Sequence, residues 1–370
     1  MITLGDVFRR YGPEYRARWG SQLSPPQVAA MEAIEACRTE RLGGQVYRCP
    51  HCDAVRYAYH SCRNRHCPTC QHDAGQDWLA RQQDLLLPVP YFLVTFTLPG
   101  ALRAVAAAHQ AQVYHLLFRA SATALQQLAH DPRFLGGQLG MLGVLQTWTR
   151  DLRYHPHIHY LVPGGGLAAD GRTWMTAKAD FLVHMKPLAI LFRAKLRAAL
   201  RQTALWTRIP AEVWRQDWVV DCRPVGSGRT ALRYLAPYVF RVALSNNRIL
   251  AMDDGQVTFR YQDGQTHQSR TCTLPAEAFI ARFLAHILPK GFVKVRAYGL
   301  LRVGARQQLA RLRAQLVLQQ RKADLRPADD ARPEPAARQE PICPSCGQAM
   351  RLERVLPPPR APPMPQPVAS

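Results

Sequence analysis

Three histidines alternate along one segment of this chain. His155, His157 and His159 lie in LRYHPHIHYLVPGGG (residues 152–166), where the Tyr, Leu and Val that follow favour a buried strand. Side chains of a regular strand alternate between two faces, so all three imidazoles would share one face. Neutral imidazoles on one face can bind a divalent metal ion. An HxH pair alone is more often a pair of satisfied core or surface histidines, so this interpretation needs support from elsewhere in the chain.

Two tyrosines provide that support. Tyr234 and Tyr238 are four residues apart in ALRYLAPYVFRVALSNNRI (residues 231–249), and on a helix this spacing puts both phenols on one face. A tyrosine phenolate can attack a phosphodiester to form a covalent phosphotyrosine. A divalent cation on a non-bridging oxygen lowers the barrier to that attack. Because the phosphodiester bond energy is kept, a free 3′-hydroxyl can reverse the step without ATP. Without the histidines, each tyrosine would be interpreted as a core aromatic residue.

Two details of this constellation stay open. Pro237 lies between the tyrosines and biases Ala236 away from the helical conformation, so the helix either begins near Pro237 or is kinked there. The sequence does not identify the third metal ligand; Gln146, on the neighbouring predicted strand, and His155 are candidates only. Because His155 precedes Pro156, the strand can begin as late as Pro156, which weakens His155 as a candidate.

Potential zinc ligands crowd into residues 37–70. They are Cys37, Cys49, Cys52, Cys62, Cys67, Cys70, His51, His60 and His66. Two CxxC pairs, Cys49/Cys52 and Cys67/Cys70, are separated by 14 residues, close to the spacing at which two such pairs share one tetrahedral Zn²⁺. Such an ion is structural, because no open coordination position is implied. Cys37, His60, Cys62 and His66 are candidates for a second ion, so we predict one or two zinc ions.

Two further cysteines, Cys343 and Cys346, form a CPSC pair with no second pair nearby. Either Cys222 or Cys272 completes a site with them, or this half-site has no function. The chain has no signal-peptide segment and no apolar run of roughly 20 residues, so we expect a cytoplasmic protein without a membrane partner. In that reducing compartment, dense cysteines favour metal binding over disulfides or redox-active thiols.

Charge is the strongest signal of the composition. The chain has 48 Lys and Arg against 26 Asp and Glu, a net charge of +22, which predicts a polyanionic partner such as nucleic acid. The alternative to a nucleic-acid partner is that the basic residues only form a solvated surface. The scarcity of Asp and Glu argues against a two-metal nuclease built on carboxylates. Three acidic residues far apart in the sequence would, however, form no visible motif. The predicted DNA contacts are Arg63, Arg65, Arg233, Arg241, Lys290, Lys294 and Arg296.

The elements that must position these residues follow from hydrophobic periodicity and turn signals. We predict strands at 91–99 and 139–152, a neighbouring strand within the histidine segment 152–166 that ends by residue 163, a strand at 217–225, and a hairpin at 246–264 whose turn is Asp254-Gly255. Helices are predicted at 76–88, 101–130, 178–208, 275–288 and 304–320. The order indicates an α+β fold, an antiparallel sheet backed by helices.

The domain organisation follows from changes in composition. We divide the chain into N-terminal helices (1–36), a zinc-binding module (37–75), a catalytic domain (76–265) and a basic helical region (266–322). The remainder (323–370) comprises a linker, the CPSC pair and a Pro-rich tail expected to be disordered.

The motifs together resemble those of one known family. His157-Ile158-His159 resembles the HUH motif (U being hydrophobic) of HUH endonucleases, and Tyr234 and Tyr238 resemble their two-tyrosine motif. With YRCPHC…YHSCRNRHCPTCQ and LPKGFVKVRAYG, residues 10–320 resemble a rolling-circle insertion-sequence transposase of the IS91 family. The cysteine segment and the tyrosine block are the most specific parts of this resemblance.

The resemblance implies a bacterial, nucleoid-associated enzyme that nicks and joins single-stranded DNA at the ends of an insertion sequence. It implies a 5′-phosphotyrosine intermediate and Mg²⁺ or Mn²⁺ on His157 and His159. A replication initiator or relaxase could use the same chemistry, and a non-catalytic zinc-containing DNA-binding regulator would explain the charge and the cysteines alone. The N-terminal zinc module, and tyrosines downstream of the histidines, favour the transposase, because many relaxases carry their tyrosine near the N-terminus. The sequence leaves open the DNA sequence recognised, the order of the two tyrosines and the oligomeric state.

Overall fold

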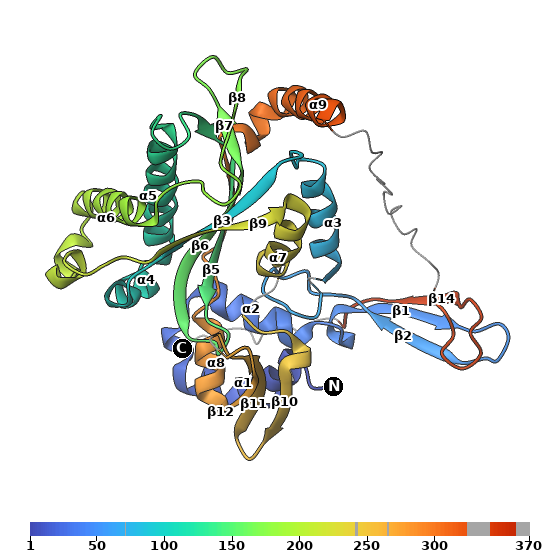
Figure 1. The fold of residues 1–370 in the computed structure, drawn as a ribbon. Coiled ribbons are helices and arrows are strands. Elements are labelled where there is room, and N and C mark those ends of the chain that lie inside the picture. Colours follow the sequence, from blue (N-terminus) through green and yellow to red (C-terminus); the bar gives the residue numbers. More distant parts are fainter. Residues whose placement is uncertain (71, 241–242, 265, 324–340, 360–370) are drawn as a thin grey trace, which may run out of the picture.

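A five-stranded antiparallel sheet forms the centre of the molecule (Figure 1). The computed structural model describes residues 1–370 except 71, 241–242, 265, 324–340 and 360–370, and describes the backbone alone at 72–77, 231, 234, 236–238, 240 and 320–323. The sheet contains, in spatial order, β13 (Val295–Tyr298), β5 (Met141–Trp148), β6 (Tyr154–Pro163), β3 (Pro90–Thr97) and β9 (Val220–Ser227). Helices cover both faces, so the predicted α+β fold with an antiparallel sheet backed by helices is confirmed.

The two faces of this sheet have different partners because side chains alternate along each strand. Even-numbered residues of β6, such as Ile158 and Tyr160, join a large apolar core with α4 (Arg103–Ala108), α5 (Gln110–His130) and α6 (Met185–Arg201). On the opposite face, Leu161 of β6 packs with Leu232 and Leu235 of α7 (Gly228–Phe240), which lies beside α3 (His72–Gln83). Figure 1 shows α5 and α6 on one side of the sheet, and α7 and α3 on the other.

A second hydrophobic core joins the N-terminal helices to elements from the second half of the chain. The N-terminal helices α1 (Leu4–Trp19) and α2 (Pro25–Ala36) pack with α8 (Ala276–Leu284) and with a three-stranded antiparallel sheet. That sheet comprises β10 (Ile249–Asp253), β11 (Gln256–Gln262) and β12 (Ser269–Pro275). A capping box between Thr3 and Asp6 begins α1, as expected for these side chains. Residues 1–36 and 266–287, which belong to separate predicted regions, therefore share one hydrophobic core.

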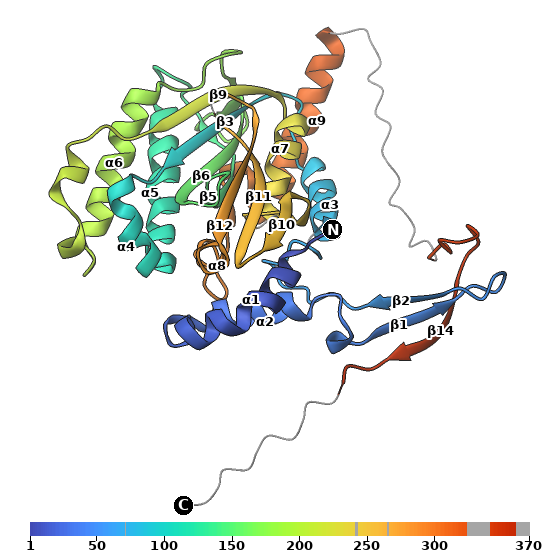
Figure 2. The same ribbon diagram turned by 90° about the horizontal axis from the view of Figure 1, so that it is seen from below.

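A second three-stranded sheet projects from the body (Figure 2). It consists of β14 (Arg351–Leu356), β1 (Gly44–Arg48) and β2 (Val55–Tyr59), all antiparallel. We call residues 44–59 and 341–356 the arm. Because β14 pairs with β1, a segment close to the C-terminus completes a sheet that the N-terminal part begins.

The remaining elements are short or peripheral. A small sheet contains β4 (Gln138–Leu139), β7 (Gly165–Leu167) and β8 (Trp174–Thr176), and α9 (Arg306–Ala323) packs beside it. The 3₁₀ helices are Gly20–Gln22, Glu40–Leu42, Gly100–Leu102, Trp206–Arg208, Ala211–Trp214, Asn246–Arg248, Gly299–Leu301 and Val303–Ala305. Within the part of the chain that the structure describes, no helix is both long enough and apolar enough to cross a membrane.

Several predicted elements differ from the observed ones. The helix expected at 101–130 is interrupted at His109, whose φ of −131° and ψ of 47° are not helical. The region 266–322, expected to be helical, contains two strands, β12 and β13, and β13 forms an edge of the central sheet. Val295 and Tyr298 are of the β-branched and aromatic types that suit a strand, but the strand is fixed by its pairing with β5, a segment far away in the sequence. The predicted hairpin at 246–264, with Asp254-Gly255 as its turn, is confirmed. Residues 324–340 of the expected linker and 360–370 of the expected tail lie outside the described residues.

Candidate functional sites: a histidine cleft and two cysteine clusters

His157 and His159 lie side by side on the face of β6 that α7 also covers. Both are odd-numbered, like Leu161, which packs against α7. Their ring centroids are 4.7 Å apart, and each residue is 8% exposed. The predicted sharing of one face by these imidazoles therefore follows from the regular register of β6 with β5 and β3.

Neighbouring groups orient the two rings. His157 Nδ1 lies 2.7 Å from the carbonyl oxygen of His155 and must donate to it, so Nε2 carries the lone pair that could bind a metal ion. His159 Nδ1 lies 2.9 Å from Thr95 Oγ1. Burial lowers the pKa of His157 to about 4 and that of His159 well below its ordinary value. Both rings are therefore neutral near pH 7, the form in which imidazole is a ligand.

Gln146 fits the third ligand position better than His155. It pairs with His157 across β5 and β6 and donates through Nε2 to the carbonyl of Trp148. Its Oε1 is buried, and no described residue hydrogen-bonds to it. His155, by contrast, receives a hydrogen bond on Nδ1 from the Arg103 guanidinium at 2.6 Å, which places the proton of a neutral ring on Nε2. The orphaned amide oxygen is a hard donor suited to Mg²⁺ or Mn²⁺.

A cleft of about 930 Å³ opens over these side chains. Its walls come from the ends of β5 and β6, from α7 and from the β10–β11 sheet. They comprise Gln146, Trp148, Thr149, Arg150, Asp151, Arg153, His155, His157, His159, Arg233, Ala243, Ser245, Arg248, Tyr261, Gln262, Asp263 and Gly264. Four arginines against two aspartates give this lining a positive charge excess, which suits an anionic ligand.

The predicted nucleophiles lie on α7. Tyr234 and Tyr238 are one turn apart on this helix, and their side chains are outside the described residues. The helix runs from Gly228 to Phe240 without a break at Pro237, so of the two alternatives left open, a helix beginning at the proline is excluded. Arg233, the residue preceding Tyr234, lines the histidine cleft. The backbone of α7 thus lies along the cleft wall, held by Leu232 and Leu235 against the sheet.

The predicted DNA-contacting residues are divided between the cleft and the rest of the molecule. Arg233 lines the cleft, Arg63 and Lys290 are exposed elsewhere, and Arg241 lies outside the described residues. Three others contact groups within the protein. Arg65 donates to the Phe292 carbonyl, Lys294 lies over the Trp148 ring, and Arg296 stacks on Phe118 at 4.3 Å. Burial also lowers the pKa of Lys294 to about 7.

The cysteines form two groups of four, in a pairing that differs from the prediction. The inner cluster contains Cys37, Cys62, Cys67 and Cys70, and the arm cluster contains Cys49, Cys52, Cys343 and Cys346. In each group the four Sγ atoms lie within 4.8 Å of one another, as tetrahedral thiolate coordination of Zn²⁺ requires. The two CxxC pairs at 49/52 and 67/70 therefore do not share a site. The physical reason is that β1 and β2 carry the first pair into the arm, away from the second pair.

His60 and His66, the histidines proposed for a second zinc site, belong to neither cluster among the described residues. His66 is buried, and its Nε2 receives a hydrogen bond from the amide of Leu288 at 3.3 Å. Burial lowers the pKa of His66 to about 3. His66 is therefore a core residue, and Cys37 and Cys62 of that candidate set are the ones that join a cluster.

Sequence reasoning missed some site residues. The sequence predicted that Cys343 pairs with Cys222 or Cys272, or has no function. Its observed partners, Cys49 and Cys52, were missed because they are about 290 positions away in the sequence. The similar motifs CPHC (residues 49–52) and CPSC (residues 343–346) are the signal that could have linked the two pairs of cysteines. The cleft arginines Arg150 and Arg153 carried no motif at all.

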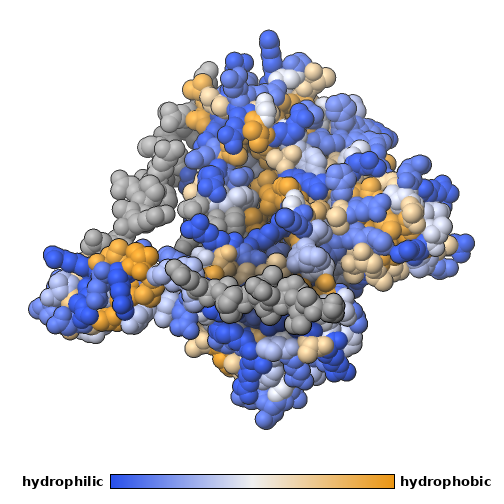
Figure 3. Space-filling view, turned by 180° about the vertical axis from the view of Figure 1, so that it is seen from behind, coloured by the Kyte–Doolittle hydropathy of each residue, from blue (hydrophilic) through white to orange (hydrophobic). Residues whose placement is uncertain are grey.

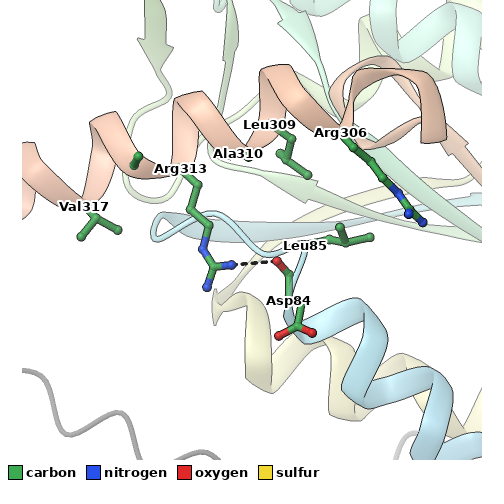
Figure 4. A pocket seen from close by; sticks show the side chains of 8 residues that line it. Asp84, Leu85, Arg306, Leu309, Ala310, Arg313 and Val317 are labelled. Carbon is green, nitrogen blue, oxygen red and sulfur yellow. Dashed lines mark hydrogen bonds between the residues drawn. The ribbon is translucent and has the colours of Figure 1, made fainter.

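A smaller hollow of about 320 Å³ lies between α9 and the loop after α3. Figure 4 shows Arg313 of α9 donating to the Asp84 carbonyl across it. The residues lining it are mostly apolar or basic, and none of the predicted catalytic residues lines it.

Comparisons with known proteins agree with the motifs. A family model described as "Putative transposase" matches residues 140–309, and the "Transposase zinc-binding domain" of IS91 type matches residues 7–98. A protein of Sinorhizobium fredii named "Putative transposase y4qJ" is 42% identical over 82% of this chain and 81% of its own length. The "Transposase for insertion sequence element IS801" of Pseudomonas savastanoi pv. phaseolicola is 28% identical over 74% of this chain and 70% of its own length. No solved structure matches the chain.

Proposed function

Because this chain belongs to the IS91 family of transposases, we propose that it nicks and joins single-stranded DNA at insertion-sequence ends through Tyr234 and Tyr238. In the nicking step, the phenol oxygen bonds to phosphorus as the bond from phosphorus to the 3′ oxygen breaks. The phenol loses its proton, and the departing 3′ oxygen gains one. The products are a 5′-phosphotyrosine and a free 3′-hydroxyl, and attack by a 3′-hydroxyl on the phosphotyrosine joins strands.

One observation carries this proposal: the helix bearing both tyrosines covers the same sheet face as His157 and His159. Leu161 is two residues after His159 on that face and packs against Leu232 and Leu235 of α7. Arg233 of the same helix lines the cleft that holds both histidines. A phosphate in this cleft would therefore lie between the imidazoles and the helix of the nucleophiles.

The donor set favours a hard divalent cation. His157 Nε2, His159 and Gln146 Oε1 would hold Mg²⁺ or Mn²⁺, with positions left for phosphate oxygens. Such an ion supplies Lewis-acid polarisation of the scissile phosphate. The surrounding residues orient these ligands and keep them in the form that binds metal. The His155 carbonyl fixes the tautomer of His157, and burial keeps both rings neutral.

The cleft chemistry also favours a single strand as the substrate. Arg150 and Arg153 are exposed and line the cleft, where their positive charge can attract the phosphates of a DNA strand. Tyr261 offers an aromatic ring in the same cleft, and unpaired bases stack on such rings without sequence preference.

A covalent-adduct assay tests the proposal. The purified chain is mixed with 3′-labelled single strands from both ends of the element that encodes it, with Mg²⁺, Mn²⁺ or chelator. We expect a labelled protein–DNA adduct that needs metal and a released 5′ fragment that a polymerase can extend. Peptide mapping should place the label on Tyr234 or Tyr238. The double variant Tyr234→Phe/Tyr238→Phe and the variant His157→Ala should form no adduct.

Tyr261→Phe is the matched control, because it removes a hydroxyl from the same cleft and should keep the adduct. A label on Tyr261, or an adduct that survives in the double variant, would reject the assigned nucleophiles. DNA binding with no adduct under any metal condition would favour the non-catalytic regulator. Adducts that only reseal the original strand, and never join a second one, would favour a replication initiator or relaxase.

A further inference from the structure

The two CxxC turns of the arm cluster have the same backbone geometry. In each turn the amide of the first cysteine donates to the carbonyl five residues later, at 2.9 Å for Cys49 and 2.8 Å for Cys343. The residue after the second cysteine donates back to the carbonyl of the first, at 3.0 Å and 2.9 Å. That residue has a left-handed φ in both turns, 57° at Asp53 and 74° at Gly347. The halves of the cluster are therefore two copies of one turn, built from segments far apart in the chain.

This turn points backbone amides at sulfur. The Cys49 sulfur receives the amides of His51 and Cys52, and the Cys343 sulfur receives those of Ser345 and Cys346. Amide donors stabilise a thiolate, the form of cysteine that binds metal. A pair of thiols with no ligand to bind has no need of this arrangement on both sides.

The distances across the cluster fit one ion. Cys49 Sγ lies 3.5 Å from Cys346 Sγ, and Cys52 Sγ lies 3.5 Å from Cys343 Sγ. A tetrahedron with Zn–S bonds of about 2.3 Å has edges of about 3.8 Å. Disulfides are excluded, because their sulfur atoms are about 2.05 Å apart, and all four cysteines are free.

Packing does little to hold the C-terminal segment on the arm. The core beneath the cluster contains only Cys49, Cys343 and Met350 as buried residues among those described. Leu352 and Val355 of β14 are 52% and 61% exposed, and Figure 3 shows apolar side chains gathered on the surface of the arm. The ion pair of Arg48 with Glu353 is largely exposed, and such pairs contribute little. A core this small needs a metal or another crosslink to be stable.

We propose that Cys49, Cys52, Cys343 and Cys346 bind a second structural Zn²⁺, which clips the C-terminal segment 341–356 onto the N-terminal zinc-binding domain. Two of its ligands lie outside both regions matched by the family models, which end at residues 98 and 309. The inner cluster, whose four ligands lie within residues 37–70, binds the other ion. The binding energy of the second ion is the folding energy of the arm, so the segment is held only while zinc is bound.

Zinc content of the intact chain tests the assignment. We expect two Zn²⁺ per chain by elemental analysis of the wild type and one in Cys343→Ser/Cys346→Ser. Cys272→Ser, which removes a half-buried cysteine outside both clusters, is the control and should keep two. One zinc in the wild type, or two in the double variant, overturns the proposal.

A cleavage experiment tests the clip itself. A specific protease site is inserted between residues 324 and 340 of the full chain and cut after folding. The fragment that begins near residue 341 should co-elute with the body and should separate on adding a chelator or in Cys343→Ser/Cys346→Ser. Retention despite chelation and mutation would show that packing alone holds the segment and would reject the clip. Neither readout uses DNA, so a failure here is distinct from a failure of the proposed strand transfer.

Discussion

The two cysteine clusters contain the same ligands but lie in different surroundings. Cys37 and Cys67 of the inner cluster are buried in the core that the N-terminal helices share with α8, while Cys52 of the arm cluster is exposed. All ligands of the inner cluster come from 34 consecutive residues, whereas the halves of the arm cluster are nearly 300 residues apart. A cluster of thiolates can therefore either reinforce a core that packing already forms, or stabilise a segment whose own core is too small.

Removing an inner ligand should have the largest effect. In Cys67→Ser, an exchange at a fully buried position, the ion and the packing around it are lost together. We expect a loss of several kcal/mol in the free energy of unfolding, or failure to fold. Urea denaturation followed by circular dichroism measures it. If Cys67→Ser and Cys343→Ser lost the same amount, the distinction between the clusters would be wrong.

Acid should destabilise the body through His286, which packs on Trp148 and Leu152 of the core around the inner cluster. Burial lowers the pKa of His286 to about 4, below the value of about 6.5 in an unfolded chain. The unfolded state therefore binds the proton first, and stability is full above about pH 6.5 and falls as the pH approaches 4.

At pH 4, the protonation of His286 should lower the free energy of unfolding by about 3 kcal/mol, because each unit of pKa difference is worth 1.36 kcal/mol. The measurement is the difference in unfolding free energy between the wild type and His286→Gln at pH 7, 5.5 and 4.5. Acid affects the cysteine clusters of both proteins equally, so that effect cancels when the two unfolding free energies are subtracted. Parallel pH curves for the two proteins would contradict the assignment.

Cys343→Ser should leave the body almost unchanged and should loosen the arm. We expect a change of less than about 1 kcal/mol in global unfolding, typical of sites remote from the core. Hydrogen exchange should nevertheless lose its protection at the amides of β1 and β14, which pair with one another, because local opening of the arm becomes favourable. Preserved protection in β14 would mean that the strand pairing is stable without the ion.

The smallest effect should come from the ion pair of Arg48 with Glu353 on the arm. Its side chains are 46% and 38% exposed, so Glu353→Gln should cost less than about 0.5 kcal/mol. Zinc content and fragment retention should not change. A larger loss would indicate that side-chain contacts, and not the metal, hold the arm together.

Local patterns in the sequence predicted how several residues of the proposed catalytic site are arranged. Alternation along residues 154–163 put His157 and His159 on one face, because strand geometry is set by neighbouring residues alone. Asp254-Gly255 marked its turn for the same reason. Long-range choices were not predicted. The strand at 295–298 was placed in a helical region, because its pairing with β5 depends on residues some 150 positions away.

The amino-acid sequence by itself determined the chemistry available to this protein: imidazoles in alternation, tyrosines at helical spacing, thiols in CxxC turns and a large positive charge. Only the tertiary structure decided which of these groups meet. It brought Gln146 beside His157, turned His155 toward Arg103, and joined Cys49 and Cys52 to Cys343 and Cys346. The physical reason is that turns and periodicities act over a few residues, whereas strand pairing and packing select partners across the whole chain.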